Sequence, residues 1–411
     1  MSPLRQIWSC SVVIFAAVAS SPAGLLAATS PDRPNILVIL ADDLGYGDVH
    51  AYNPERGKIP TPNLDRLARE GMRFTDGHAS SAACSPSRYT LLTGRYHWRT
   101  RLQTGIVDLW EEPLIAPGRL TVAGLARQKG YRTAAFGKWH LGWDWPIKPE
   151  HKPLMRGLGG RSGRSKDKLV TTPTDAHRAA WKEVFSQRIA GGPVTRGFEH
   201  YFGTDVPNQS PYCFIENDRT VGMPSVFLPL PLLRGQLAGI GGPALEHWKL
   251  EGILPALGDR AVDFITRQAK ARQRFFLYLP LTSPHTPIAP NAEWRGQSGL
   301  GNYADFVMET DALVGRVLAA LDASGAASNT LVLFTSDNGF WNDAAQRWLV
   351  DTSPSKSARI LEQWVSDHQR LVGNKDSTPA AIRLRALWTL EGQGRLTSEI
   401  LQIAMEDPDP T

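Results

Sequence analysis

The feature that most limits the possible folds is a series of continuous apolar runs separated by segments with helical spacing. The runs lie at residues 34–41, 131–136, 275–280 and 330–335. The first of them lacks the alternation of a half-exposed strand, which indicates a strand covered on both faces. Helical patterns occur at 61–71, 84–94, 120–130, 257–270 and 303–321, and a further short strand is predicted at 72–75. Strands that alternate with helices predict the α/β class, with a largely parallel central sheet flanked by helices.

Reactive side chains follow the ends of these predicted strands. They are Asp42, Asp43, Lys138, His140, His285, Asp337 and Asn338. The carboxyl ends of parallel strands meet at one edge of a sheet, where ligands bind in open α/β folds, so we expect these side chains to share one site. Each residue alone also has a structural explanation: an aspartate can bond backbone amides in a turn, and an isolated lysine is usually solvated.

The stretch from Cys84 to Gly94 combines a cysteine with a helix start. Pro86 presets the backbone for a first helical turn, so Cys84 is predicted to lie just ahead of a short helix. Arg88, one turn further, would face the same spot as the unpaired N–H groups of the helix start, which bind anions. Cysteine beside an anion site suggests chemistry on a sulfated or phosphorylated group. A buried structural cysteine is the alternative.

Four side chains of the predicted site carry oxygen donors: Asp42, Asp43, Asp337 and Asn338. Oxygen donors suit a hard cation such as calcium or magnesium. The spacing alone leaves a metal site and capped turns as open alternatives.

Two motifs resemble those of a known family. Cys84 to Gly94 is similar to the signature of the type I sulfatases, which are arylsulfatase-like members of the alkaline phosphatase superfamily, and Gly130 to Gly142 resembles their second signature. The resemblance implies that Cys84 is converted to formylglycine by a formylglycine-generating or sulfatase-maturating enzyme. It also implies one metal ion, usually Ca²⁺ with Mg²⁺ as an alternative, at a site formed by Asp42, Asp43, Asp337, Asn338 and the group derived from Cys84.

The same resemblance implies roles for the remaining residues. The hydrated aldehyde from Cys84 would attack sulfur with help from Asp337, and His140 would later take the proton that lets sulfate leave. Lys138 and Arg88 would stabilise developing charge together with the metal. His285 would contact the sulfate or the leaving oxygen.

The chain is predicted to have three parts. Residues 1–28 have the charged start and short apolar stretch of a signal peptide, residues 34–340 form the catalytic domain, and residues 341–411 form a helical tail. The tail resembles one HEAT-type repeat in place of the usual sulfatase C-terminal subdomain and its further lysine, whose role we assign to no residue. The tail is either a fusion or a rearranged reading frame. Within the catalytic domain, 145–197 is predicted to be a surface excursion and 206–232 an irregular, proline-rich rim.

Composition restricts the partners and the compartment. A formal charge of +5 without a long basic run argues against nucleic acid. The signal-like segment predicts export to a periplasm or the medium, with no membrane attachment after cleavage. Of the three cysteines, Cys10 would leave with the signal. If Cys84 becomes an aldehyde, Cys213 has no partner in the chain and is predicted to be a buried or semi-buried thiol.

The sequence therefore predicts an exported sulfuric ester hydrolase that acts on a sulfated small molecule or polysaccharide. Two alternatives stay open: a catalytically impaired protein that binds sulfated glycans, and a formylglycine-dependent phosphodiester or phosphonate monoester hydrolase.

Overall fold

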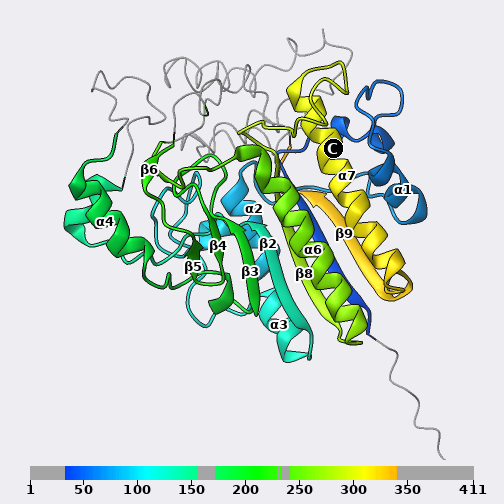
Figure 1. Ribbon diagram of the computed structural model, residues 1–411. Helices are drawn as coiled ribbons and strands as arrows, with labels where there is room; N and C mark the ends of the chain where they lie inside the picture. Colours follow the sequence, from blue (N-terminus) through cyan, green and yellow to red (C-terminus); the bar gives the residue numbers. More distant parts are fainter. Residues whose placement is uncertain (1–32, 156–171, 229–231, 233–240, 340–411) are drawn as a thin grey trace, which may run out of the picture. The chain divides into compact units, whose positions relative to one another are not determined.

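The computed structural model describes residues 33–155, 172–228, 232 and 241–339 (Figure 1). The predicted signal peptide at 1–28 and the predicted HEAT-like tail at 341–411 lie outside the described residues. Both stay predictions.

Strands and helices alternate along most of the described chain. The strands are β1 Asn35–Asp42, β2 Arg132–Lys138, β3 His200–Thr204, β4 Phe214–Glu216, β5 Arg219–Val221, β6 Val226–Phe227, β7 Pro243–Ala244, β8 Phe275–Pro284 and β9 Thr330–Ser336. The α-helices are α1 Pro62–Glu70, α2 Cys84–Thr93, α3 Val122–Gln128, α4 Asp175–Phe185, α6 Ile253–Lys270 and α7 Asn302–Ala323. Short 3₁₀ turns lie at Tyr46–Asp48, His50–Tyr52, His97–Arg99, Pro149–Leu154, Pro193–Thr195, Leu250–Gly252 and Ala327–Asn329.

The central sheet has seven strands in the order β5-β4-β3-β2-β8-β1-β9. The five strands from β3 to β9 run parallel, and only the short β4 and β5 at one edge are antiparallel. In the register of the middle strands, Val38 of β1 lies between Tyr278 of β8 and Leu333 of β9. The predicted α/β class with a largely parallel sheet is confirmed, and the carboxyl ends of the parallel strands meet at one edge.

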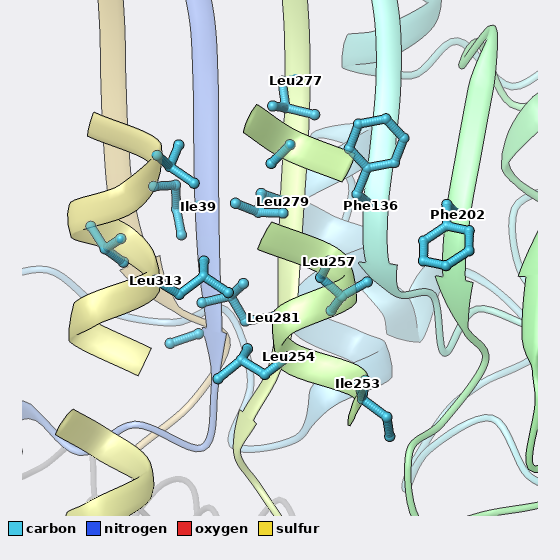
Figure 2. Close-up of a cluster of buried hydrophobic side chains, with 14 of the residues drawn as sticks. Ile39, Phe136, Phe202, Ile253, Leu254, Leu257, Leu277, Leu279, Leu281 and Leu313 are labelled. Carbon is cyan, nitrogen blue, oxygen red and sulfur yellow. The ribbon is translucent and has the colours of Figure 1, made fainter. Parts of the chain in front are cut away.

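One face of the sheet is covered by α6 and α7, which lie along the strands (Figure 1). Leu37 and Ile39 of β1 point to this face together with Leu277 and Leu279 of β8, and they pack with Leu257 of α6 (Figure 2). Each fully buried leucine of this kind stabilises the fold by about 2 kcal/mol.

The opposite face carries the alternate residues of the same strands. Val38 of β1 and Phe276 of β8 pack there with Tyr89 and Leu92 of α2 and with Ala126 of α3. Because both faces of β1 and β8 are covered, residues 36–41 and 275–281 are all apolar, which is why these runs in the sequence do not alternate.

Several sequence predictions of local structure are wrong or incomplete. Residues 72–75 form no strand: Met72 is 80% exposed and Phe74 is 64% exposed, and the pairings of the described strands do not include this segment. The segment 145–197, which was predicted to be a surface excursion, contains α4. Its Trp181 is fully buried in the apolar cluster that also contains Val38 and Phe276. The predicted irregular rim at 206–232 includes β4 and β5, which extend the sheet.

Candidate active site

Two neighbouring strands bring the acidic residues of the predicted site together. Asp42 is the last residue of β1, and Asp337 directly follows β9. Because β1 and β9 pair in parallel, the backbone N–H of Asp43 donates to Oδ1 of Asp337 at 3.2 Å. The side-chain amide of Asn338 donates to Oδ1 of Asp43. All four predicted oxygen ligands therefore lie in one buried cluster.

Cys84 lies beside this cluster, on α2, which packs on the face of the sheet opposite α6 and α7. It is the first residue of α2, so the helix begins one or two residues earlier than its proline predicted. Its Sγ lies 3.4 Å from Oδ1 of Asp42, and the side chain is 7% exposed. Burial raises the pKa of the Cys84 thiol well above its usual value. The thiol itself is therefore protonated and a poor nucleophile.

Two fully buried cations face the same acids. Arg88, one turn after Cys84, has Nη2 at 2.7 Å from Oδ2 of Asp337 and 3.1 Å from Oδ1 of Asp42. Lys138, the last residue of β2, places Nζ at 2.7 Å from Oδ2 of Asp42. Arg88 also donates to the backbone oxygen of Lys138 at 3.0 Å, which ties α2 to the end of β2.

The charges in the cluster do not balance. Among the residues that the structure describes, Arg88 and Lys138 are the buried lysine and arginine side chains that face Asp42, Asp43 and Asp337. Burial and the neighbouring Asp42 raise the pKa of both Asp43 and Asp337 to about 7, whereas Lys138, His285 and Arg88 outweigh burial and lower the pKa of Asp42. When all three carboxyl groups are ionised, as they would be with a cation bound, they exceed the charge of Arg88 and Lys138 by one.

A divalent cation fits these residues. Asp42, Asp43, Cys84 and His285 can offer ligand atoms that lie within 4.8 Å of one another. Oδ1 of Asn338 is buried, and no hydrogen-bond partner for it occurs among the described residues. Oxygen-rich donors with a surplus of negative charge are the environment that calcium and magnesium prefer.

His140 lies two residues after β2 and leaves the extended path of the strand. Its φ is +53°, which lies in the left-handed region of backbone conformation. Its Nε2 contacts the backbone oxygen of Val107 at 3.2 Å. Burial, Lys138 and Arg88 lower the pKa of His140 well below its usual value, so the imidazole is neutral near pH 7.

His285 follows β8 and closes the cluster. Its Nε2 lies 3.6 Å from Oδ2 of Asp43, and its Nδ1 contacts the backbone oxygen of Thr286. Burial is the main cause that lowers its pKa. The sequence assigned His285 to the substrate, and the geometry also makes it a possible metal ligand.

Sequence reasoning missed Asp205. This residue directly follows β3, and it accepts a hydrogen bond from the backbone N–H of His140 at 3.1 Å. The other acids of the site were found because each lies just past a predicted strand. Asp205 has the same position after β3, but the sequence did not predict a strand at 197–203. Cys213 is free and buried, as predicted.

Within the described part of the chain, no helix is both long enough and apolar enough to cross a membrane.

The fold and this cluster define a class of hydrolases, the arylsulfatase-like type I members of the alkaline phosphatase superfamily. The chain belongs to the sulfatase family, whose model, described as "Sulfatase", matches residues 34–347. It is 33% identical over 316 residues to an N-acetylgalactosamine-6-O-sulfatase of Bacteroides thetaiotaomicron and 32% identical over 346 residues to arylsulfatase A of Bos taurus. These alignments cover 75% and 82% of this chain but only 59% and 56% of the relatives.

Solved structures agree with this family. A structure from work on the metabolism of glycosaminoglycans by Bacteroides thetaiotaomicron aligns with a TM-score of 0.60 and 28% identity, over 79% of this chain and 67% of that one. A sulfatase from Pseudoalteromonas sp. aligns with a TM-score of 0.52 and 24% identity, over 75% of this chain and 55% of that one, which supports the fold alone.

Proposed function

We propose that this protein hydrolyses a sulfate ester, on an aryl group or a carbohydrate, at the cluster around Cys84. The observation that carries the proposal is the pair of fully buried cations, Arg88 and Lys138, held beside Cys84 by shared acids. Charges buried in this way are costly unless they serve a ligand or a fixed network. Membership of the sulfatase family and the relatives named above support sulfate as the group that is bound.

The metal would be held by Asp42, Asp43, Asp337 and Asn338, with His285 close to it. It would supply charge stabilisation to a substrate oxygen, and a formylglycine made from Cys84 would supply the nucleophile. We propose calcium as the ion, with magnesium as the alternative. A formylglycine-generating or sulfatase-maturating enzyme would be the partner that converts Cys84, and the signal-like segment at 1–28 would direct export.

The chain's own residues would then act on charge and protons. Arg88 and Lys138 would face the negative charge that grows on the sulfate oxygens. His140 is neutral near pH 7, so it can accept a proton after the alcohol has left. His285, beside Asp43, would contact the sulfate or the leaving oxygen.

The charge of the cluster also favours one kind of ester. With a divalent cation bound, the single uncompensated negative charge becomes a single positive charge, which a singly charged ester neutralises. Sulfate monoesters carry one charge near pH 7, whereas phosphate monoesters carry close to two. Phosphonate monoesters and phosphodiesters also carry one charge, and this match keeps them as the second candidate substrates.

A comparison of four nitrophenyl esters tests the proposal. We expect kcat/KM for the sulfate to exceed that for the phenylphosphonate, with a phosphodiester similar to the phosphonate and the phosphate monoester lowest. All four activities should disappear in Cys84→Ala, which serves as the control for a shared site. A higher kcat/KM for the phosphonate than for the sulfate would favour the second candidate, and a phosphate monoester preference would contradict both.

A further inference from the structure

The backbone of His140 is held in a conformation that non-glycine residues rarely adopt. Its φ of +53° lies in the left-handed region. The N–H of His140 points at Asp205 and lies 3.1 Å from both its backbone oxygen and its Oδ1. Asp205 therefore contacts the residue at the point where the chain leaves β2.

The imidazole of His140 has one defined hydrogen bond. Its Nε2 lies 3.2 Å from the backbone oxygen of Val107, and a carbonyl oxygen can only accept. Nε2 therefore carries the proton, and Nδ1 keeps its lone pair. Nδ1 is buried and has no hydrogen-bond partner among the residues that the structure describes. A free basic nitrogen in a buried position is suited to accept a proton from a reacting group.

Asp205 also lies close to the indole of Trp143, whose nitrogen has no hydrogen-bond partner among the described residues. Burial raises the pKa of Asp205 to about 6, while the nearby Trp143 indole and the hydrogen bond from the N–H of His140 act to lower it. Trp143 is 1% exposed, and its backbone N–H donates to the oxygen of Glu111 at 3.1 Å. The carboxylate of Asp205 thus joins β3 to the segment that carries His140.

We propose that Asp205 is a positioning residue, which holds His140 in its left-handed conformation so that Nδ1 of the imidazole stays free to accept a proton. The proposal rests on the proposed function for its effect on turnover, but the position of His140 can be tested separately. In the proton transfer, the lone pair of Nδ1 would take the proton from the second hydroxyl of the hydrated group made from Cys84; the electrons of that O–H bond would re-form the aldehyde as sulfate leaves, and the imidazole would become an imidazolium.

We expect Asp205 to act on His140 through the position that it gives the residue rather than through its own charge. The charges that act most strongly on the His140 ring are those of Lys138, Arg88 and Asp42. An asparagine at position 205 would keep a side-chain oxygen that can accept from the N–H of His140. Asp205→Asn should therefore preserve the position of His140, whereas Asp205→Ala keeps only the backbone oxygen as an acceptor and should loosen it.

The kinetic test uses the full chain with converted Cys84, calcium and nitrophenyl sulfate. We expect Asp205→Ala to lower kcat about 10- to 100-fold with KM changed less than about threefold, and Asp205→Asn to recover most of the loss. Because His140 would act after nitrophenol leaves, the first-turnover burst of nitrophenol should keep its amplitude in Asp205→Ala. Loss of folded enzyme would lower that amplitude instead. Asp144→Ala, which removes an exposed acid near Trp143, is the matched control and should match wild type.

The structural test measures the ring nitrogens of His140 by ¹⁵N NMR, with His140→Gln to identify the signals. Wild type and Asp205→Asn should show a protonated Nε2 and a bare Nδ1, and Asp205→Ala should show a mixture of tautomers. Unchanged signals and unchanged kcat in Asp205→Ala would overturn the proposal. If the signals change but wild type has no turnover, the positioning role stands and the proposed function fails.

Discussion

At the scale of single residues, the site is defined by charges that the fold forces together. Asp43 and Asp337 both have a pKa raised to about 7, because each is buried near Asp42. An acid whose pKa is higher in the folded state than in the unfolded state binds protons more tightly when folded. The metal-free protein therefore loses stability from these two residues as the pH rises from about 4 through 7.

Calcium should reverse this trend, because a bound cation favours the ionised carboxylates. We predict that calcium raises Tm more at pH 8 than at pH 5. At pH 5 a carboxyl group with a pKa of about 7 must lose its proton before it can bind calcium, which weakens calcium binding about a hundredfold. Thermal unfolding with calcium or with a chelator measures this difference, and the histidines contribute to both curves. Asp337→Asn should reduce the rise, and Asp311→Asn, a buried acid that bonds Leu64, should keep it. An equal rise at both pH values would contradict the metal assignment.

At the scale of elements, β2 can place Lys138 beside Asp42 because the preceding residue, Gly137, has no side chain. Gly137 has a φ of +143°, and a Cβ there would lie 1.7 Å from the backbone oxygen of Pro280. The close approach of β2 and β8 at this point is what aims Lys138 at Asp42.

Gly137→Ala should therefore destabilise the protein by about 3 kcal/mol, because neither backbone can move without disturbing the sheet. Gly94→Ala is the matched control: Gly94 also has a positive φ, 64°, but a Cβ there meets nothing within 4 Å, so the cost should be about 1 kcal/mol. Urea unfolding gives both values. Equal midpoints for the two variants would show that the contact with Pro280 is not limiting.

The elements also show how far the sequence could lead. Long apolar runs predicted β1, β8 and β9, and the site residues that follow them were found with them. Burial on both faces explains the runs of β1 and β8, whereas β9 lies at the edge of the described sheet and its Leu331 and Leu333 are 49% and 43% exposed. Asp205 was missed because β3, with Gly203 and the polar His200 and Thr204, has no such pattern. The conformation of His140 depends on contacts with Asp205 and Val107, which are far away in the sequence.

At the scale of the whole molecule, the chain spans 59% and 56% of the length of the two relatives named above. The described residues nevertheless contain every residue that the sequence assigned to the site. We therefore propose that the cluster around Cys84 is sufficient for turnover of a simple ester, whatever sugar or aryl group the natural substrate carries.

The most direct measurement combines the mass of the Cys84 peptide with release of sulfate from nitrophenyl sulfate. The chain should be co-expressed with a formylglycine-generating enzyme, because Cys84 is only 7% exposed once the protein has folded. We predict a loss of about 18 mass units on that peptide, as a thiol becomes an aldehyde, and release of sulfate that stops when calcium is removed. Cys213→Ala should behave like the wild type, and Cys84→Ala should be inactive. Conversion of Cys84 without any release of sulfate, or release by Cys84→Ala, would contradict the account.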